Sequence, residues 1–357
     1  MSPRLFLLGG SLAAASLFSA CSEKANAADK DPGTPTPTPV AADVAVTLSG
    51  SGASFPAPLY DTWFKEYGKT SKDRVNYTSK GSSGGKKDLI EGVVDFAGSD
   101  SAMKDEEMAK VAGGVQLLPM TAGGVVMIYN LDGVKDLKLS RETLAGIYLG
   151  EIKKWNDDKL KADNAGVALP DVAIQVVYRS DGSGTTFCFT NHLGAISAKW
   201  KAGPGTGDSV NWPVGSGGKK NDGVAAQVKQ TPGAIGYVEL SFAKTAGLPM
   251  ASLQNKAGTF VAPSIKNFQA ALAGSDLPEN MRLFLPDPDG KDAYPIVTYT
   301  WILTYKAYPK DKLGALQRAL EWCLTKGQDM SEQLGYVPLP EKVTSRVRSA
   351  LGKLQAK

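Results

Sequence analysis

Three short loops rich in glycine and hydroxyl residues carry the groups of this chain that could do chemistry. They lie at 50–56 (GSGASFP), 81–85 (GSSGG) and 179–185 (RSDGSGT). Each loop connects a segment typical of a strand to a segment typical of a helix. Glycines let backbone N–H groups approach a ligand, and a helix N-terminus presents N–H groups that lack an intrahelical partner. Together the loops predict a cage for a small oxyanion that needs little net positive charge.

Asp100, at the end of the segment VDFAGSD, is the acidic residue that we place with these loops. A carboxylate beside an anion is repelled unless the anion carries a proton that the two can share. Phosphate carries such a proton near neutral pH, whereas sulfate does not. We therefore expect Asp100 to accept a hydrogen bond from phosphate and to disfavour sulfate by about 10⁴-fold or more, whereas arsenate should be excluded poorly.

Burial of a doubly charged anion removes its water, and this loss has to be offset by many fixed donors. Each charge-assisted hydrogen bond contributes about 1.5–3 kcal/mol. Arg179 would supply a planar cation with two N–H prongs, and Asp181 could pair with it and offset its charge. Hydroxyl or backbone N–H donors are expected from six further residues, namely Ser54, Phe55 (backbone), Ser82, Ser183, Gly184 and Thr185.

Each feature alone is also typical of an ordinary turn, helix cap or surface ion pair. The loops do not match the known nucleotide-phosphate motifs, because 81–87 lacks the Walker spacing and no G-x-G-x-x-G opens a βαβ unit. An enzyme acting on phosphate esters remains an alternative, since the same donors could hold a transferring phosphoryl group. However, the sequence has no identifiable metal cluster, activated nucleophile or G-x-S-x-G elbow with a triad, so we expect no catalytic residue, metal or cofactor.

The histidine and the cysteines add no chemistry to this interpretation. His192 is the single histidine, which excludes multi-histidine metal sites, and we expect it on a helix surface. Cys188 and Cys323 lie in apolar helical patterns without metal-ligand spacing, and we expect buried thiols that are distant from each other, a disulfide outside the cytoplasm being the alternative.

The first 20 residues are typical of an export signal, with Arg4 ahead of an apolar run and small residues before Cys21. This segment resembles a bacterial lipoprotein signal, in which the cysteine is lipidated; an ordinary secretory signal is the alternative. Residues 22–44 carry proline at every second position over 35–39, which predicts an extended tether. We therefore expect an extracytoplasmic protein, anchored by lipid to a bacterial membrane.

The composition is that of an ordinary globular protein, with 42% hydrophobic and 21% charged residues. The formal net charge is +4, and removal of residues 1–20, which contain only Arg4, leaves +3. So small an excess, without basic blocks and interleaved aromatics, argues against nucleic acid as a partner. We expect the lysine pairs at 86–87, 153–154 and 219–220 to lie on solvated faces.

Strand and helix patterns alternate along the rest of the chain, which indicates an α/β fold. The valine-rich segment 172–178 is typical of a central strand and would deliver Arg179 to the carboxyl end of a sheet, where such folds bind ligands. Ser140 is the expected cap of the next helix after strand 123–130. The other expected elements are strands at 75–77, 94–97, 233–238 and 296–305, and helices after 85, at 312–325 and at 341–351.

Several motifs in fixed order resemble the phosphate-binding protein family of the bacterial phosphate-specific ABC transporter. The resemblance runs from about residue 48 to the C-terminal region and includes 50–60, 81–85, 94–100, 147–155, 181–185, 221–223 and 232–237. By matching positions it implies that the eight cage residues bind phosphate and that Asp181 braces Arg179. Where the family commonly has threonine this chain has Ser54, which retains the hydroxyl.

The resemblance also implies a two-lobed, type II-like periplasmic-binding-protein fold with a mixed sheet in each lobe and a hinge. We expect lobe I at 46–121 plus 297–357 and lobe II at 122–296, with crossings near 120–124 and 294–298. The implied function is that of a monomeric phosphate receptor that delivers its ligand to membrane ABC permease subunits and is not an enzyme. A surface lipoprotein that keeps the fold without the cage is a further alternative.

Overall fold

The computed structural model describes residues 45–357, which form one compact unit. The expected signal, the Cys21 anchor and the tether to residue 44 lie outside the described residues. No helix within 45–357 is long and apolar enough to cross a membrane.

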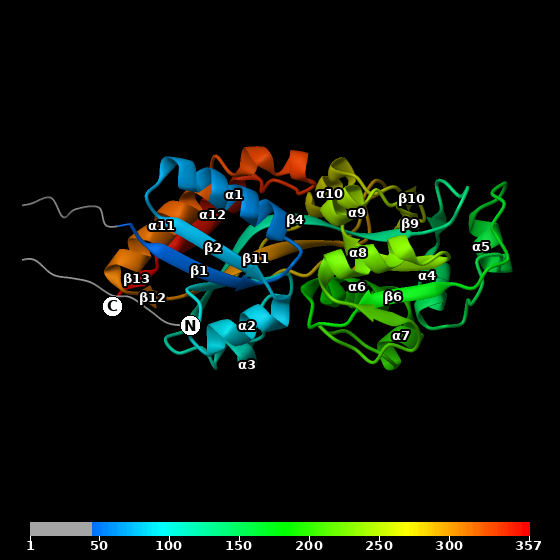
Figure 1. Ribbon diagram of the computed structural model, residues 1–357, viewed down its shortest axis with the longest axis horizontal. Helices are drawn as coiled ribbons and strands as arrows, with labels where there is room; N and C mark the ends of the chain where they lie inside the picture. The colour runs from blue at the N-terminus through cyan, green and yellow to red at the C-terminus, as the bar shows by residue number, and fades with distance from the viewer. Residues whose placement is uncertain (1–44) are drawn as a thin grey trace, which may run out of the picture. The chain divides into compact units, whose positions relative to one another are not determined.

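An eight-stranded mixed sheet forms the centre of the fold (Figure 1). Strands β1, β2 and β3 pair in parallel, as do β6, β7 and β8, whereas β11 and β4 run antiparallel to their neighbours. Across the sheet the order is β2 (Arg74–Ser79), β1 (Thr47–Gly52), β3 (Phe96–Ser99), β11 (Val297–Tyr305), β4 (Val115–Tyr129), β8 (Ala234–Glu239), β6 (Gln175–Arg179) and β7 (Ser216–Gly218).

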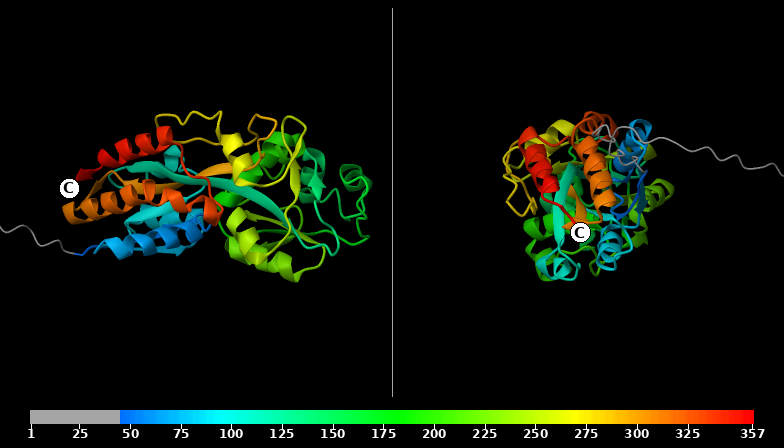
Figure 2. Two further views of the ribbon diagram at one scale, coloured as in Figure 1. Left: turned by 90° about the horizontal axis from the view of Figure 1, so that it is seen from above. Right: turned by 90° about the vertical axis from the view of Figure 1, so that its left-hand side faces the viewer.

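The long strand β4 joins two groups of strands in this sheet and runs through both of them (Figure 2). Residues 115–124 of β4 pair with β11, and residues 125–129 pair with β8. The two segments that we expected as crossings lie side by side, because Gly123 pairs with Thr298 and Gly124 with Val297. The strands expected in two lobes thus belong to one sheet that is continuous through β4. The lobe boundaries stay a prediction.

Helices and short strands complete the described fold (Figure 1). The helix bounds are α1 (Ala57–Thr70), α2 (Ser82–Ile90), α3 (Asp105–Met108), α4 (Arg141–Tyr148), α5 (Asp158–Asp163), α6 (Gly184–Ile196), α7 (Ala198–Ala202), α8 (Lys220–Gln230), α9 (Leu240–Ala246), α10 (Ile265–Leu272), α11 (Lys310–Leu324) and α12 (Glu341–Gly352). The short strands are β5 (Lys138–Leu139), β9 (Ser252–Gln254), β10 (Phe260–Val261), β12 (Ala307–Tyr308) and β13 (Gln355–Ala356).

Local sequence explains where the helices that border the site begin. In α1, Pro58 stands in the first turn, where no intrahelical N–H bond is lost. Helix α6 begins after Ser183, whose hydroxyl accepts the Thr186 N–H at 3.1 Å. Ser140 caps α4 in the same way, as predicted, through the Thr143 N–H.

Several sequence expectations were wrong in detail. Strand β6 begins at Gln175 rather than 172, where Val172 is 43% exposed, and α2 begins at Ser82 rather than after 85. His192 is buried rather than on a helix surface, because α6 packs on both sides and its ring nitrogen Nδ1 lies 2.7 Å from the Pro286 carbonyl. Lys86 is also buried, whereas its neighbour Lys87 is exposed. The buried state of Cys188 and Cys323 is confirmed, and both are free thiols.

Gly85 predicts a test of how tightly α2 is packed on the sheet. An added Cβ would lie 2.5 Å from Gly52 Cα and 2.7 Å from the Ser51 carbonyl oxygen, both of them backbone atoms. We expect Gly85→Ala to lower the free energy of unfolding by about 1–3 kcal/mol, measured in urea. Gly68→Ala in α1 is the control: its Cβ meets no atom closer than 3.7 Å, so it should stabilise the protein by up to about 1 kcal/mol. Equal effects of the two substitutions would contradict the packing described here.

Candidate functional site

The predicted cage residues lie at the carboxyl ends of strands β1, β2, β3 and β6, on both sides of the long strand β4. Ser54 and Phe55 follow β1, Ser82 opens α2, and Asp100 follows β3. Ser183, Gly184 and Thr185 follow β6 at the start of α6. All eight candidate residues are buried, and the seven other than Gly184 have exposures of 0–2%.

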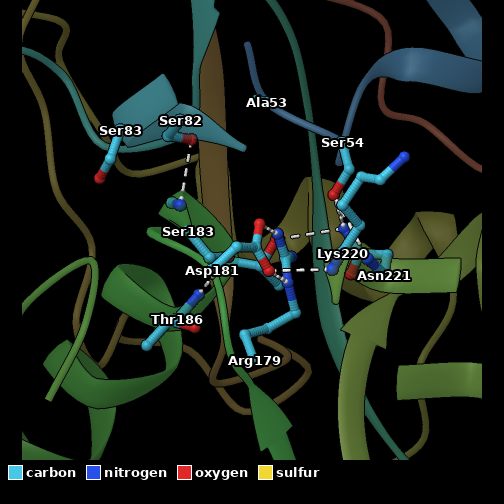
Figure 3. Close-up of polar contacts among 12 residues, drawn as sticks. Ala53, Ser54, Ser82, Ser83, Arg179, Asp181, Ser183, Thr186, Lys220 and Asn221 are labelled. Atoms are coloured by element: carbon cyan, nitrogen blue, oxygen red, sulfur yellow. Dashed lines mark hydrogen bonds and ion pairs between the residues drawn. The ribbon is translucent and has the colours of Figure 1, made fainter. Parts of the chain in front are cut away.

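Arg179 and Asp181 form a bidentate ion pair at the end of β6 (Figure 3). Arg179 Nε donates to Asp181 Oδ1 at 2.9 Å, and Nη2 donates to Oδ2 at 2.6 Å. The Lys220 N–H also donates to Asp181 Oδ1, at 2.9 Å. Burial favours a higher pKa for Asp181, but the hydrogen bonds and charge of Arg179 outweigh it and lower the pKa. The carboxylate therefore stays ionised and fixes the plane of the guanidinium, as expected.

Ser82 joins the start of α2 to the start of α6. Its Oγ accepts the Gly184 N–H at 3.0 Å and the Asp100 N–H at 3.2 Å (Figure 3 shows the bond toward α6). A Cβ at Gly184 would lie 2.6 Å from Ser82 Oγ and 2.7 Å from Asp100 Cβ. Only glycine fits there, so the close approach of the two loops requires this residue.

A second chain of hydrogen bonds runs from Ser54 to Arg179. Asn221, in the first turn of α8, donates to Ser54 Oγ from its backbone N–H at 3.3 Å and from Nδ2 at 2.9 Å. Nδ2 also donates to Thr185 Oγ1 at 3.3 Å, and Arg179 Nη1 donates to the same oxygen at 3.3 Å. The amide oxygen of Asn221 accepts the Glu239 N–H, which fixes the amide orientation.

Asp100 is held from strand β11. Thr300 Oγ1 donates to Asp100 Oδ1 at 2.8 Å, while Ser82 Oγ lies 3.5 Å from Oδ2. Burial raises the pKa of Asp100 to about 7, although the Thr300 hydrogen bond and the charge of Arg179 oppose the shift. The pKa of this carboxyl group is thus close to the pKa at which phosphate itself loses its second proton.

Phe55 and Ser183 are held in position by hydrogen bonds to Tyr336 and Asp208, neither of which belongs to the predicted cage. The Phe55 carbonyl accepts the Tyr336 hydroxyl at 2.7 Å, and the two rings meet edge to face. Ser183 Oγ caps α6, and its N–H donates to the Asp208 carbonyl at 2.8 Å. The roles of these two residues toward an anion stay predictions.

The structure brings the predicted residues into two hydrogen-bonded groups, Ser82–Gly184–Asp100 and Ser54–Thr185–Arg179–Asp181. Sequence reasoning missed Asn221 and Thr300 as members. Asn221 lies in the family motif at 221–223 and at a helix start, and this position could have indicated it. Nothing in the sequence near Thr300 distinguishes this residue from other strand threonines. The site combines hydroxyls, a fixed guanidinium and two helix N-termini, a donor set suited to a tetrahedral oxyanion. Within residues 45–357 no group of three or more His, Cys, Asp or Glu side chains could hold a metal ion.

The raised pKa of Asp100 predicts a pH dependence of stability in phosphate-free buffer. The folded state binds a proton near pH 7, whereas an ordinary aspartate does so near 3.8. The folded protein therefore gains stability as the pH falls from about 7 toward 4, by at most about 1.4 kcal/mol per pH unit. Glu239, whose pKa burial raises to about 8, contributes in the same direction.

Comparison with Asp100→Asn isolates the Asp100 contribution, because Glu239 titrates in both proteins. Urea unfolding at pH 8 and pH 5 should show wild type gaining stability relative to Asp100→Asn at pH 5. A difference that does not change with pH, or that favours the variant at pH 5, would show that Asp100 is not held in a desolvated site.

Comparisons with known proteins agree with the geometry. A family model described as PBP superfamily domain matches residues 33–321. The chain is 44% identical to the phosphate-binding protein PstS of Pasteurella multocida, covering 85% of this chain and 90% of that one, and 43% identical to PstS of Haemophilus influenzae, covering 85% and 92%. The fold matches a solved structure of a high affinity periplasmic phosphate-binding protein bound with phosphate, with a TM-score of 0.70, 23% identity and coverage of 85% and 93%. The α/β periplasmic-binding-protein fold is thus confirmed, and the chain belongs to the PBP superfamily and, within it, to the PstS family of phosphate-binding proteins.

Proposed function

We propose that the chain is a receptor for inorganic phosphate that works outside the cytoplasm and delivers its ligand to an ABC-type permease. The observation that carries the proposal is the packing of Asp100, whose carboxyl group is buried, against Ser82 and Gly184, with the fixed guanidinium of Arg179 near enough for its charge to lower the pKa of that carboxyl. The relatives at 43–44% identity carry the name phosphate-binding protein.

The proposed ligand shell uses the eight predicted residues and adds a support for the acid. Backbone N–H groups of Phe55 and Thr185, together with four hydroxyls and Arg179, would donate to phosphate oxygens, and the Gly184 N–H would turn from Ser82 Oγ to the ligand. Asp100 would accept the proton of the ligand through Oδ2, since Thr300 already donates to Oδ1. Asp181 would contribute by holding Arg179 rather than by contacting the ligand.

The shell comes from both groups of strands that β4 joins, which supports a mechanism based on closure. Ser54, Ser82 and Asp100 follow strands on the β11 side of β4, and Arg179 to Thr185 follow β6 on the other side. Phosphate would stabilise the closed arrangement by contacts that only this arrangement makes, and a permease could then distinguish the loaded receptor. The protein would act as a monomer.

An enzyme of phosphate esters is the less favoured alternative. The donor groups described above would hold an anion, and the hydroxyl of Ser82, which lies 3.5 Å from Asp100 Oδ2, already accepts two backbone N–H groups rather than standing free as a nucleophile. The name of the 44% identical relative also describes a binding protein. Absence of phosphatase activity with added divalent metals, in protein that binds phosphate, would separate the two functions.

Calorimetry with phosphate and sulfate tests the proposed role of Asp100. Asp100→Asn can donate from its amide to sulfate, so the phosphate-over-sulfate preference should fall at least tenfold, with the larger part of the change in sulfate binding. Asp222→Asn, an exposed acid next to Asn221, removes the same charge and should leave the preference unchanged. An unchanged preference in Asp100→Asn would contradict the assignment.

A lipid anchor at Cys21 is the second part of the proposal. The small residues before Cys21 and the proline-rich residues after it support an anchored and tethered protein. In cells, wild-type protein should fractionate with membranes and carry acyl mass at its N-terminus.

The variant Cys21→Ala should carry no acyl mass and, once its signal is cleaved, should be released from the membrane fraction, because it has no lipid to hold it there. Immunoblots of membrane and soluble fractions, with mass spectrometry of the mature N-terminus, measure this directly. Wild-type protein found wholly in the soluble fraction with an unmodified N-terminus would favour the ordinary secretory signal.

A further inference from the structure

Lys86 is a buried charge close to the candidate site but outside the set of proposed ligand contacts. It lies one helical turn after Ser82 on the same side of α2, and it is 5% exposed. Its Nζ lies 3.2 Å from Asp208 Oδ2 and 3.4 Å from Glu107 Oε2. The adjacent Lys87 pairs with Glu91 at the surface, and its side chain is 72% exposed. Burial of one lysine of the pair indicates a specific role, because a lysine is seldom buried without one.

Asp208, in the segment between α7 and β7, gathers contacts from both sides of the site. Its Oδ2 accepts Ser83 Oγ at 3.0 Å and Lys86 Nζ at 3.2 Å, both from α2. Its backbone carbonyl accepts the N–H of Ser183, the residue that caps α6. One residue thus binds the starts of the two helices that point their N-termini at the candidate site.

Two further hydrogen bonds join the start of α2 to the loop that precedes α6 and to the start of α6. The Ser83 N–H donates to the Gly182 carbonyl at 3.2 Å, and the Gly184 N–H donates to Ser82 Oγ at 3.0 Å. Four of these links, Ser83 and Lys86 to Asp208, Ser83 to Gly182 and Gly184 to Ser82, connect α2 to the segment from β6 to β7. Helix α2 follows β2, and β2 and β6 lie on opposite sides of β4 in the sheet. The contacts therefore hold together the two segments that the proposed closure would bring into contact.

We propose that Lys86 and Asp208 form a latch that keeps the starts of α2 and α6 together and so sets how long a bound anion stays in the site. The proposal rests on the phosphate-binding function proposed above. Both residues act as positioning residues, since neither belongs to the ligand shell. A broken latch leaves buried Lys86 with Glu107 alone, or Asp208 with Ser83 alone, and so favours opening, which raises the dissociation rate. Lys86→Met does not change which oxyanion the shell prefers, because Asp100 keeps its neighbours, whereas Asp208→Asn also removes a charge that raises the pKa of Asp100.

The test uses Lys86→Met, Asp208→Asn, the double variant and the matched control Lys87→Met, which removes the same charge from the same helix. Stopped-flow measurement of phosphate release should show a dissociation rate at least about tenfold higher for each latch variant. The double variant should release phosphate no faster than the faster single variant, because the two residues share one interaction. Lys87→Met should stay within about twofold of wild type, and the phosphate-over-sulfate ratio should be retained in Lys86→Met and Lys87→Met.

Hydrogen exchange of the ligand-free proteins provides a readout that does not depend on phosphate. The amides of Ser83 and Gly184 should exchange at least about tenfold faster in Lys86→Met and Asp208→Asn, and at the wild-type rate in Lys87→Met. If Lys86→Met fails to fold, Asp208→Asn and Ser83→Ala carry the same test. Should wild type bind no phosphate, the proposed function fails, and the exchange rates still decide the latch.

Wild-type rates of release and exchange in folded Lys86→Met and Asp208→Asn would overturn the latch. Additive effects in the double variant, or an equal effect of Lys87→Met, would do so too, since they would indicate a general effect of charge.

Discussion

The structure depends on a buried carboxyl group that has to remain next to a site for an anion. Asp100 is 1% exposed, and burial raises its pKa to about 7. Under the proposed function, the ionised form of this acid repels sulfate but accepts the proton that phosphate brings, so its burial would separate phosphate from sulfate. Arg179 forms an ion pair with Asp181, which largely compensates the positive charge of the guanidinium near the site. Fixed dipoles and hydroxyls would then hold the ligand, and they could favour one protonation state over another because they are already in place.

The fold serves this interaction by bringing distant segments to one place. Strands β1, β3 and β6 each end at the site, and the long strand β4 connects the two groups of strands from which these ends come. Thr300 reaches Asp100 from 200 residues further along the chain, and Tyr336 reaches the Phe55 carbonyl from 281 residues away. Long-range pairing of β11 with β3 and β4 therefore positions the acid, while local helix starts position the donors.

The sequence was informative where the chemistry is local. Glycine, serine and a following helix are enough to predict the loops at 81–85 and 179–185, and Asp181 lies two residues from Arg179, so their pairing could be anticipated. The contributions of Thr300 and Asn221 depend on strand register and on contacts between distant segments, which no local pattern encodes. Lys86 and Lys87 look alike as a sequence pair; only the phase of α2 and the presence of Asp208 bury one and expose the other. His192 was misplaced because one polar residue in an apolar helix does not reveal which side is covered.

An atomic-resolution structure of the protein with phosphate bound tests the central claim most directly. The account predicts one short hydrogen bond of about 2.5–2.7 Å between a phosphate oxygen and Asp100 Oδ2, with Thr300 still donating to Oδ1 and Arg179 donating to a different phosphate oxygen. A phosphate held by Arg179 and the helix starts while Asp100 points away from it, or bound elsewhere on the molecule, would contradict the claim that this carboxyl group recognises the proton of the ligand.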